Sequence, residues 1–408
     1  MSTSRLNRYL STFLLFLLTI GYPLVTTMFL PNGIEADLTV SRVVTVPYRA
    51  FVLGLSLTVI VLNWKRRIRL NLPLKLYFLF WFFLSMRIIY DLFIRTDIII
   101  DPSVVQNMLL YSYLTCFVPA IAISRSVGVI DYDLVFKWIL GGIILLIPFL
   151  ASNSPALFSS GGAEVRLTGN IALNPISLGI SGVVMTVFGL SLMVRTGQMW
   201  QKWLGAALMV SGLVVIFRSG SRGPLVVFVS SMLFYALARL DNPIWTFLTA
   251  FVMASFLFVG DVIFELIGRI SPIMASRMTL SGNVTQYEEL TTNRNKLFSA
   301  AFEKFVDHPL FGDAYALVFP DGSIFYSHNM VLDAFMALGI FGGCLFVAII
   351  LVAIRNSFQL IRHHHCYWWI GLLCMSYVVS HMFSGCFYQA DTLNALLVIL
   401  LYIPAIIR

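Results

Sequence analysis

Long runs of apolar residues recur along almost the whole chain, and they restrict the fold more than any other feature. The runs are about 18 to 25 residues long, the length that a helix needs to cross about 30 Å of hydrocarbon. In lipid, only helices and closed barrels satisfy every backbone hydrogen bond. The runs lack the alternation of barrel strands, so we predict an all-α, polytopic integral membrane protein.

The composition supports this class and excludes others. Of 408 residues, 59% are hydrophobic and only 11% are charged, whereas a soluble domain has about 25% charged residues. The net charge of +8 does not indicate nucleic acid, because membrane proteins concentrate Lys and Arg in cytoplasmic loops. The five cysteines form no CxxC pair. We therefore expect no disulfide framework, no metal site and no cofactor.

The distribution of cations predicts the topology. With about twelve spans, both termini lie on one side, and that side receives about fifteen of the 27 Lys and Arg residues in mostly short loops. Cation-rich short loops are cytoplasmic. The whole chain, residues 1–408, is then a single transmembrane domain with one large outer loop over 262–328. The candidate spans are 9–30, 46–63, 73–94, 103–124, 134–152, 173–194, 203–217, 224–240, 243–262, 329–354, 367–384 and 389–406.

The large loop contains an amphipathic segment that we expect to lie along the membrane surface. Thr291, Thr292 and Asn293 offer N-cap residues, and His308-Pro309 ends the predicted helix. Between them, one helical face carries an apolar stripe, formed by Leu297, Phe298, Ala301, Phe302 and Phe305.

A second polar segment, Arg218 to Pro224, separates two spans. Arg222 lies at the boundary of the following span, and an arginine beside a helix N-terminus forms an anion site. The alternative is an arginine that snorkels to the interface. The predicted outer location argues against a stray cation there.

Two more residues of the large loop are candidates for chemistry. Arg294 opens the predicted helix, where a cation opposes the helix dipole; the alternative is a solvated arginine. His328 directly precedes the tenth span, and imidazole accepts protons near neutral pH; the alternative is a hydrogen-bonded surface histidine. Asn329 and Asp333 follow on the next turn and are placed to orient His328.

Other polar residues have a structural interpretation. Arg87 and Asp91 are spaced for an i, i+4 pair near the end of the third span, and His308 is interpreted as a helix-end residue. No P-loop, HExxH, GxSxG or Asp-x-Asp motif is present. A leaving group is therefore better stabilised by arginines than by a divalent ion.

Taken in order, these motifs resemble the bacterial O-antigen polymerase and O-antigen ligase superfamily. The resemblance covers about 166–345. It rests on Arg166 to Gly169 with Asn174-Pro175, Ser221 to Pro224, Asn293-Arg294, Phe302 to Phe305, His308 to Gly312, His328-Asn329 and Leu338 to Gly342.

The resemblance implies a metal-independent, GT-C-like glycosyltransferase of the bacterial inner membrane. Its donor would be a glycan on undecaprenyl pyrophosphate, and its acceptor a sugar hydroxyl at the periplasmic face. Arg222 and Arg294 would neutralise the leaving pyrophosphate, and His328 would be the general base. Arg218, Arg166 and Asn329 are the expected additional substrate contacts.

Three functions remain open at this point. A polymerase passes the glycan to a lipid-linked repeat unit, and a ligase passes it to lipid A–core; we favour the polymerase because polymerases are more numerous and diverse. The family also implies a chain-length regulator as a partner. The third possibility, a flippase for lipid-linked oligosaccharides, predicts ionisable residues at mid-membrane and paired halves of the chain.

Overall fold

The computed structural model describes residues 3–30, 38–66, 70–95, 111–153, 174–195, 197–240, 284–319, 324–363 and 366–402. These segments are helical almost throughout. The helices are α1 Thr3–Phe16, η1 Leu17–Gly21, α2 Tyr22–Phe29, α3 Leu38–Leu62, α4 Leu72–Phe93, η2 Tyr111–Phe117, α6 Val118–Ser126, α7 Tyr132–Asn153, α8 Pro175–Arg195, α9 Met199–Arg218, α10 Arg222–Ala238, α14 Val284–Asp307, α15 Met330–Arg362, α16 Trp368–Phe383, η4 Phe387–Gln389 and α17 Asp391–Tyr402. Strands β1 Leu317–Val318 and β2 Ile324–Phe325 pair antiparallel.

The predicted all-α membrane class is confirmed. In the described part of the chain, 7 helical segments are long and apolar enough to cross a membrane. Three shorter apolar helices, α10, α16 and α17, accompany them. The count of about twelve spans and the GT-C-like arrangement stay predictions, and the candidate span 243–262 lies outside the described residues. The 7 segments are Ser4–Phe29, Arg42–Leu62, Leu72–Asp91, Tyr132–Leu150, Pro175–Arg195, Met199–Arg218 and Met330–Arg362.

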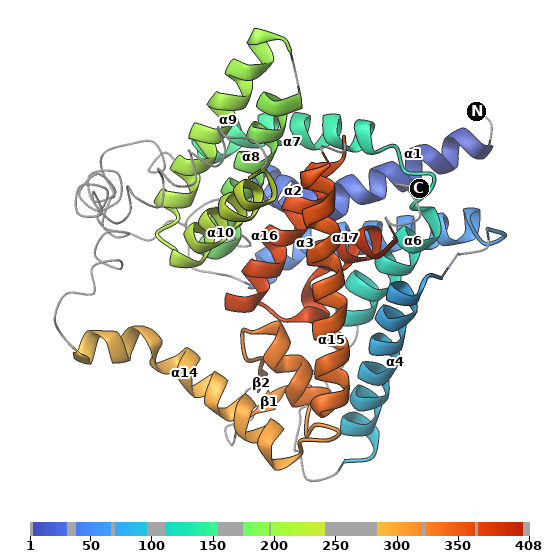
Figure 1. Cartoon of the computed structure of the whole chain (residues 1–408), viewed down its shortest axis with the longest axis vertical. Coiled ribbons are helices and arrows are strands. Elements are labelled where there is room, and N and C mark those ends of the chain that lie inside the picture. The colour runs from blue at the N-terminus through green and yellow to red at the C-terminus, as the bar shows by residue number, and fades with distance from the viewer. Residues whose placement is uncertain are drawn as a thin grey trace.

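Helix α15 is the central element. It contacts α4, α10, α14, α16 and α17, and in Figure 1 it runs through the middle of the molecule. Helix α14 crosses below the other helices, and its C-terminal end reaches the region of β1 and β2. The described part of the large loop, from α14 onward, therefore packs on the first part of α15.

Helices α8 and α9 form a close antiparallel hairpin because glycines face each other. A Cβ atom added at Gly182 would lie 2.6 Å from the carbonyl oxygen of Gly212, and one at Gly189 would lie 2.6 Å from that of Gly205. Small residues allow such close approach between helices in membranes. At the end of the hairpin, a Cβ at Gly179 would lie 2.4 Å from Pro224. The turn that carries Arg222 is thus packed directly on α8.

A kink at Gly339 divides α15 and locks it to the loop that follows α14. Gly339 has φ 64° and ψ −159°, a conformation essentially restricted to glycine. The amide of Ile340 donates to the carbonyl of Pro309 at 2.7 Å, and the amide of Asp313 donates to that of Met336 at 2.9 Å. The two backbones touch here, because a Cβ at Gly339 would lie 2.4 Å from the carbonyl group of Leu310.

The N-cap prediction for the amphipathic helix was wrong. Helix α14 begins at Val284, so Thr291 to Asn293 lie inside it and Arg294 does not open it. The preceding residues include Gln286, Glu288 and Glu289 with no Pro or Gly, and such residues extend a helix more readily than Thr or Asn stops it. The predicted end is confirmed, since α14 ends at Asp307.

Part of the predicted apolar stripe packs as expected. Ala301 is fully buried against Met336 and Leu317, and the rings of Phe305 and Phe335 lie 5.3 Å apart. Phe302, in contrast, is 56% exposed. Helix α14 therefore uses a narrow face to pack on α15.

The Gly339 kink leads to a stability prediction. We expect Gly339→Ala to lower the free energy of unfolding by about 3 kcal/mol or more, because the residue loses its allowed backbone conformation and its Cβ overlaps a carbonyl group. Gly54→Ala in α3 is the matched control, since a Cβ there meets nothing within 4 Å. Thermal unfolding of the detergent-purified variants measures the difference. Equal melting temperatures for the two variants would contradict the role of the kink.

Candidate functional site

His328 lies in a tight turn between β2 and α15. Its φ is 62°, and among the described residues it is the only one other than glycine with a positive φ. Such a conformation costs about 1–3 kcal/mol and is often found at functional sites. Two contacts hold the turn. The amide of Ser327 donates to Oδ1 of Asp333 at 2.8 Å, and the hydroxyl of Ser327 donates to the carbonyl of Asn329 at 3.0 Å.

Asn329 and Asp333 bind the backbone on either side of His328 and make no direct hydrogen bond to its imidazole. The side-chain oxygen of Asn329 accepts from the amides of Val331 and Leu332, both at 3.0 Å, and so caps α15. Asp333 holds the amide of Ser327 instead. Both residues therefore fix the backbone on either side of His328, and a role of Asn329 in substrate binding stays a prediction.

The surroundings of His328 favour its neutral form. Burial lowers the pKa of His328 below 6.5, and the positive charge of Arg294 lowers it further. The ring of Tyr326 packs edge-on at 4.5 Å, and burial raises the pKa of Tyr326 to about 12. At neutral pH the imidazole is therefore uncharged and able to accept a proton.

Two of the three predicted catalytic residues thus lie within electrostatic reach of each other. Arg294 of α14 lies close enough to act electrostatically on both His328 and Tyr326. The chain between Arg294 and His328 contains the end of α14 and both strands. Packing of α14 on α15 is what closes this distance, because Ala301 and Met336 share one buried cluster.

Arg218 and Arg222 flank the turn between α9 and α10. Arg218 is the last residue of α9 and is buried, and Arg222 is the first residue of α10. Gly220 allows the reversal with φ 58°, and the hydroxyl of Ser219 donates to the carbonyl of Ile216 at 2.8 Å. The start of α10 at Arg222 confirms the predicted span boundary. The convergence of Arg222 with His328 remains a prediction, and Arg166 lies outside the described residues.

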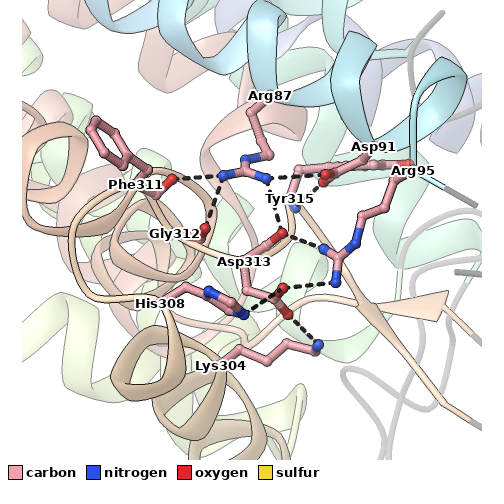
Figure 2. A network of polar contacts seen from close by, with 9 residues as sticks. All are labelled: Arg87, Asp91, Arg95, Lys304, His308, Phe311, Gly312, Asp313 and Tyr315. Atoms are coloured by element: carbon pink, nitrogen blue, oxygen red, sulfur yellow. Dashed lines mark hydrogen bonds and ion pairs between the residues drawn. The ribbon is translucent and has the colours of Figure 1, made fainter. Parts of the chain in front are cut away.

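A buried polar network joins α4 to the loop after α14 (Figure 2). Arg87 donates to the carboxylate of Asp91 at 3.2 Å, which confirms the predicted i, i+4 pair. It also donates to the carbonyl oxygens of Phe311, Gly312 and Asp313 at 2.7, 2.9 and 3.0 Å. Sequence reasoning missed these contacts, because no local spacing indicates a partner more than 200 residues away.

Asp313 forms the second half of this network. Arg95 approaches its Oδ1 at 2.8 Å, Lys304 binds Oδ2, and Nε2 of His308 lies 3.7 Å from Oδ1. Burial disfavours the charged carboxylate, but Lys304 and Arg95 outweigh it and lower the pKa of Asp313 below its ordinary value. The acid is therefore ionised and fully engaged at neutral pH.

A groove of about 1160 Å³ lies beside the network, between α4 and α15. Its walls include Phe83 and Met86 from α4, and Phe341 and Leu345 from α15. We assign the network to holding the fold, because the guanidinium of Arg87 is already occupied by Asp91 and three carbonyls. The described residues that line the groove do not include Arg294, Tyr326 or His328, so we treat it as separate from the His328 site.

The described residues contain no group of three or more His, Cys, Asp or Glu side chains placed to hold a metal ion. Whether the reaction proceeds without a metal remains a prediction.

The central part of the chain is similar to a known protein family. Residues 204–347 match a family model described as O-antigen ligase. The resemblance to the O-antigen ligase and polymerase superfamily is thereby confirmed. The matched O-antigen ligase region runs from α9 to α15 and includes Arg218, Arg222, Arg294 and His328. No curated protein matches the chain. The described part of the chain thus contains helices apolar enough to span a membrane, and its central region is similar to a family of glycosyltransferase-like enzymes.

The arginine network leads to a second stability prediction. We expect Arg87→Ala to cost about 3–5 kcal/mol, because it removes the donor to the carbonyls of Phe311 and Gly312 and leaves the buried carboxylate of Asp91 without its bound arginine. Arg8→Ala is the matched control: Arg8 also binds an aspartate, Asp131, but its side chain is 59% exposed, so the cost is below about 1 kcal/mol. Denaturant unfolding of both variants tests this. A loss at Arg87 no larger than that at Arg8 would show that the network is dispensable.

Proposed function

We propose that the protein transfers a glycan from undecaprenyl pyrophosphate to a sugar hydroxyl of an acceptor, at the periplasmic face of the bacterial inner membrane. One observation carries this proposal. His328, which is held neutral in a strained turn, lies within electrostatic reach of Arg294 in α14. Both residues lie inside the region that matches the O-antigen ligase model.

His328 is the general base in this proposal. It takes the proton of the acceptor hydroxyl while the acceptor oxygen bonds to the anomeric carbon of the donor sugar. The bond from that carbon to the pyrophosphate breaks, and the leaving group keeps its electron pair. A base in this position contributes typically 10²–10⁴-fold to the rate. The half-buried site supports the role, because burial and Arg294 keep the pKa of His328 below 6.5.

Arg222 and Arg294 stabilise the departing pyrophosphate. Fixed guanidinium groups match phosphate oxygens in pairs and stay charged, and they act where negative charge develops. They replace a divalent ion in this proposal, so the reaction is metal-independent. The packing of the α9–α10 turn on Gly179 supports a fixed position for Arg222. Arg218, Arg166 and Asn329 are the proposed additional substrate contacts.

The acceptor distinguishes two forms of the proposal. We favour a polymerase of O-antigen or another surface polysaccharide, which uses a lipid-linked repeat unit and works with a chain-length regulator. The alternative is a ligase that uses lipid A–core, and the description of the matching family model favours it. Both forms use the same donor and leaving group, so the same three residues serve either. A flippase is the weakest alternative, because the match is to a family of glycosyltransferase-like enzymes.

Alanine substitution tests the catalytic set. We expect His328→Ala, Arg222→Ala and Arg294→Ala each to lower glycan transfer by 10²-fold or more, with normal amounts of protein in the membrane. Lys296→Ala is a matched control, since Lys296 is an exposed cation on the same helix as Arg294. Transfer assays on purified protein with a lipid-linked donor give the rates. Full activity in all three variants would eliminate the proposed site.

Deletion of the gene separates polymerase from ligase. If the protein is a polymerase, lipopolysaccharide on a gel will show core capped by a single repeat unit. If it is a ligase, the gel will show bare core, and the polymer will remain on its lipid carrier. Unchanged lipopolysaccharide and unchanged surface polysaccharide would contradict both forms.

A further inference from the structure

Asp333 is a buried acid with an unused oxygen. It lies in the first turn of α15, and the residue is 3% exposed. Its Oδ1 accepts from the amide of Ser327 at 2.8 Å, whereas its Oδ2 is buried without a hydrogen-bond partner. It forms no ion pair with any residue that the structure describes. A buried carboxyl in a membrane-spanning helix is costly and therefore usually has a function.

Other buried polar atoms near Asp333 also lack partners. They include Nδ1 of His328 and the hydroxyls of Tyr388 and Tyr315. The rings of Tyr315 and Tyr388 lie 6.4 Å apart, and Asp333 lies within electrostatic reach of both Tyr388 and Tyr326. Proteins leave few buried polar groups unsatisfied, and buried water usually bridges those that remain. Buried polar atoms of this kind are the usual partners of internal water.

We propose that Asp333 is a positioning residue for His328. Its Oδ1 holds the turn that places His328 at φ 62°. In the ionised carboxylate, its Oδ2 accepts, through buried water, the hydrogen of Nδ1. A neutral imidazole carries one N–H group, so fixing it at Nδ1 leaves Nε2 as the proton acceptor. The inference rests on the proposed function of His328 as the general base.

The charged and titratable groups around the pair are consistent with this assignment. Arg294 from α14 and Tyr326 from the segment after β2 face His328. Cys386 and Tyr388, from the segment before α17, and Tyr326 interact with Asp333. Arg294 disfavours the imidazolium, so His328 rests as a neutral tautomer. The acceptor at Oδ2 then determines which nitrogen carries the hydrogen.

Asp333→Asn separates positioning through Oδ2 from support of the turn. The amide oxygen of asparagine still accepts from Ser327, so the turn is kept. The amide nitrogen, however, donates where Oδ2 accepted. We therefore expect the imidazole to change from the Nδ1–H to the Nε2–H tautomer, and kcat to fall on the order of 10-fold or more with KM unchanged.

Nitrogen-15 NMR of the full-length protein in lipid bilayers measures the tautomer directly. The His328 signal is assigned by its loss in His328→Ala. Asp133→Asn is the matched control, because Asp133 is also an acid in the first turn of a spanning helix, α7, but pairs with Arg195 and is 52% exposed. We expect no change of tautomer and no change of rate in that variant.

Two results would overturn the inference. One is an Nε2–H tautomer in the wild-type protein, which needs no variant to be observed. The other is full activity of Asp333→Asn with loss of activity in Asp333→Ala, which would reduce Asp333 to a support of the turn. Full activity of His328→Ala would refute the proposed function, and the tautomer measurement would still decide whether Asp333 positions His328.

Discussion

The interlock between the loop after α14 and the kink of α15 is the constraint on which the rest of the site depends. Gly312 and Gly339 both have positive φ, and each meets the backbone of the other segment. Arg87 binds three successive carbonyls of this loop from α4. The loop is therefore fixed to two spanning helices, and α14 and both strands leave it in set directions. This arrangement brings Arg294 within electrostatic reach of His328.

The acids at this end of the helices fall into two groups. Asp91 binds Arg87 and the amide of Tyr315, and Asp313 binds Arg95 and Lys304. These acids have complete partners and stabilise the fold. Asp333 is buried to a similar degree but keeps one oxygen unused. Because an unpaired buried carboxyl is costly, its retention beside His328 is better explained by function than by stability.

The accuracy of the sequence predictions depended on the range of the interaction concerned. The helix end at Asp307, the start of α10 at Arg222 and the Arg87–Asp91 pair follow from neighbouring residues, and all three are confirmed. The N-cap at Thr291 to Asn293 was wrong, since helix propensity continues upstream of weak cap residues. The carbonyl partners of Arg87 were missed entirely, because main-chain acceptors have no residue signature.

The sequence by itself determined the membrane class, since runs of apolar residues can satisfy their backbone in lipid only as helices. Its ordered motifs between Ser221 and Gly342 also indicated a resemblance to the superfamily, and the family model matches the region that contains them. Only the tertiary structure decided which of these segments meet. The electrostatic proximity of His328 and Arg294 and the isolation of the Asp333 oxygen arise from packing between distant segments, and local periodicity contains no information about such packing.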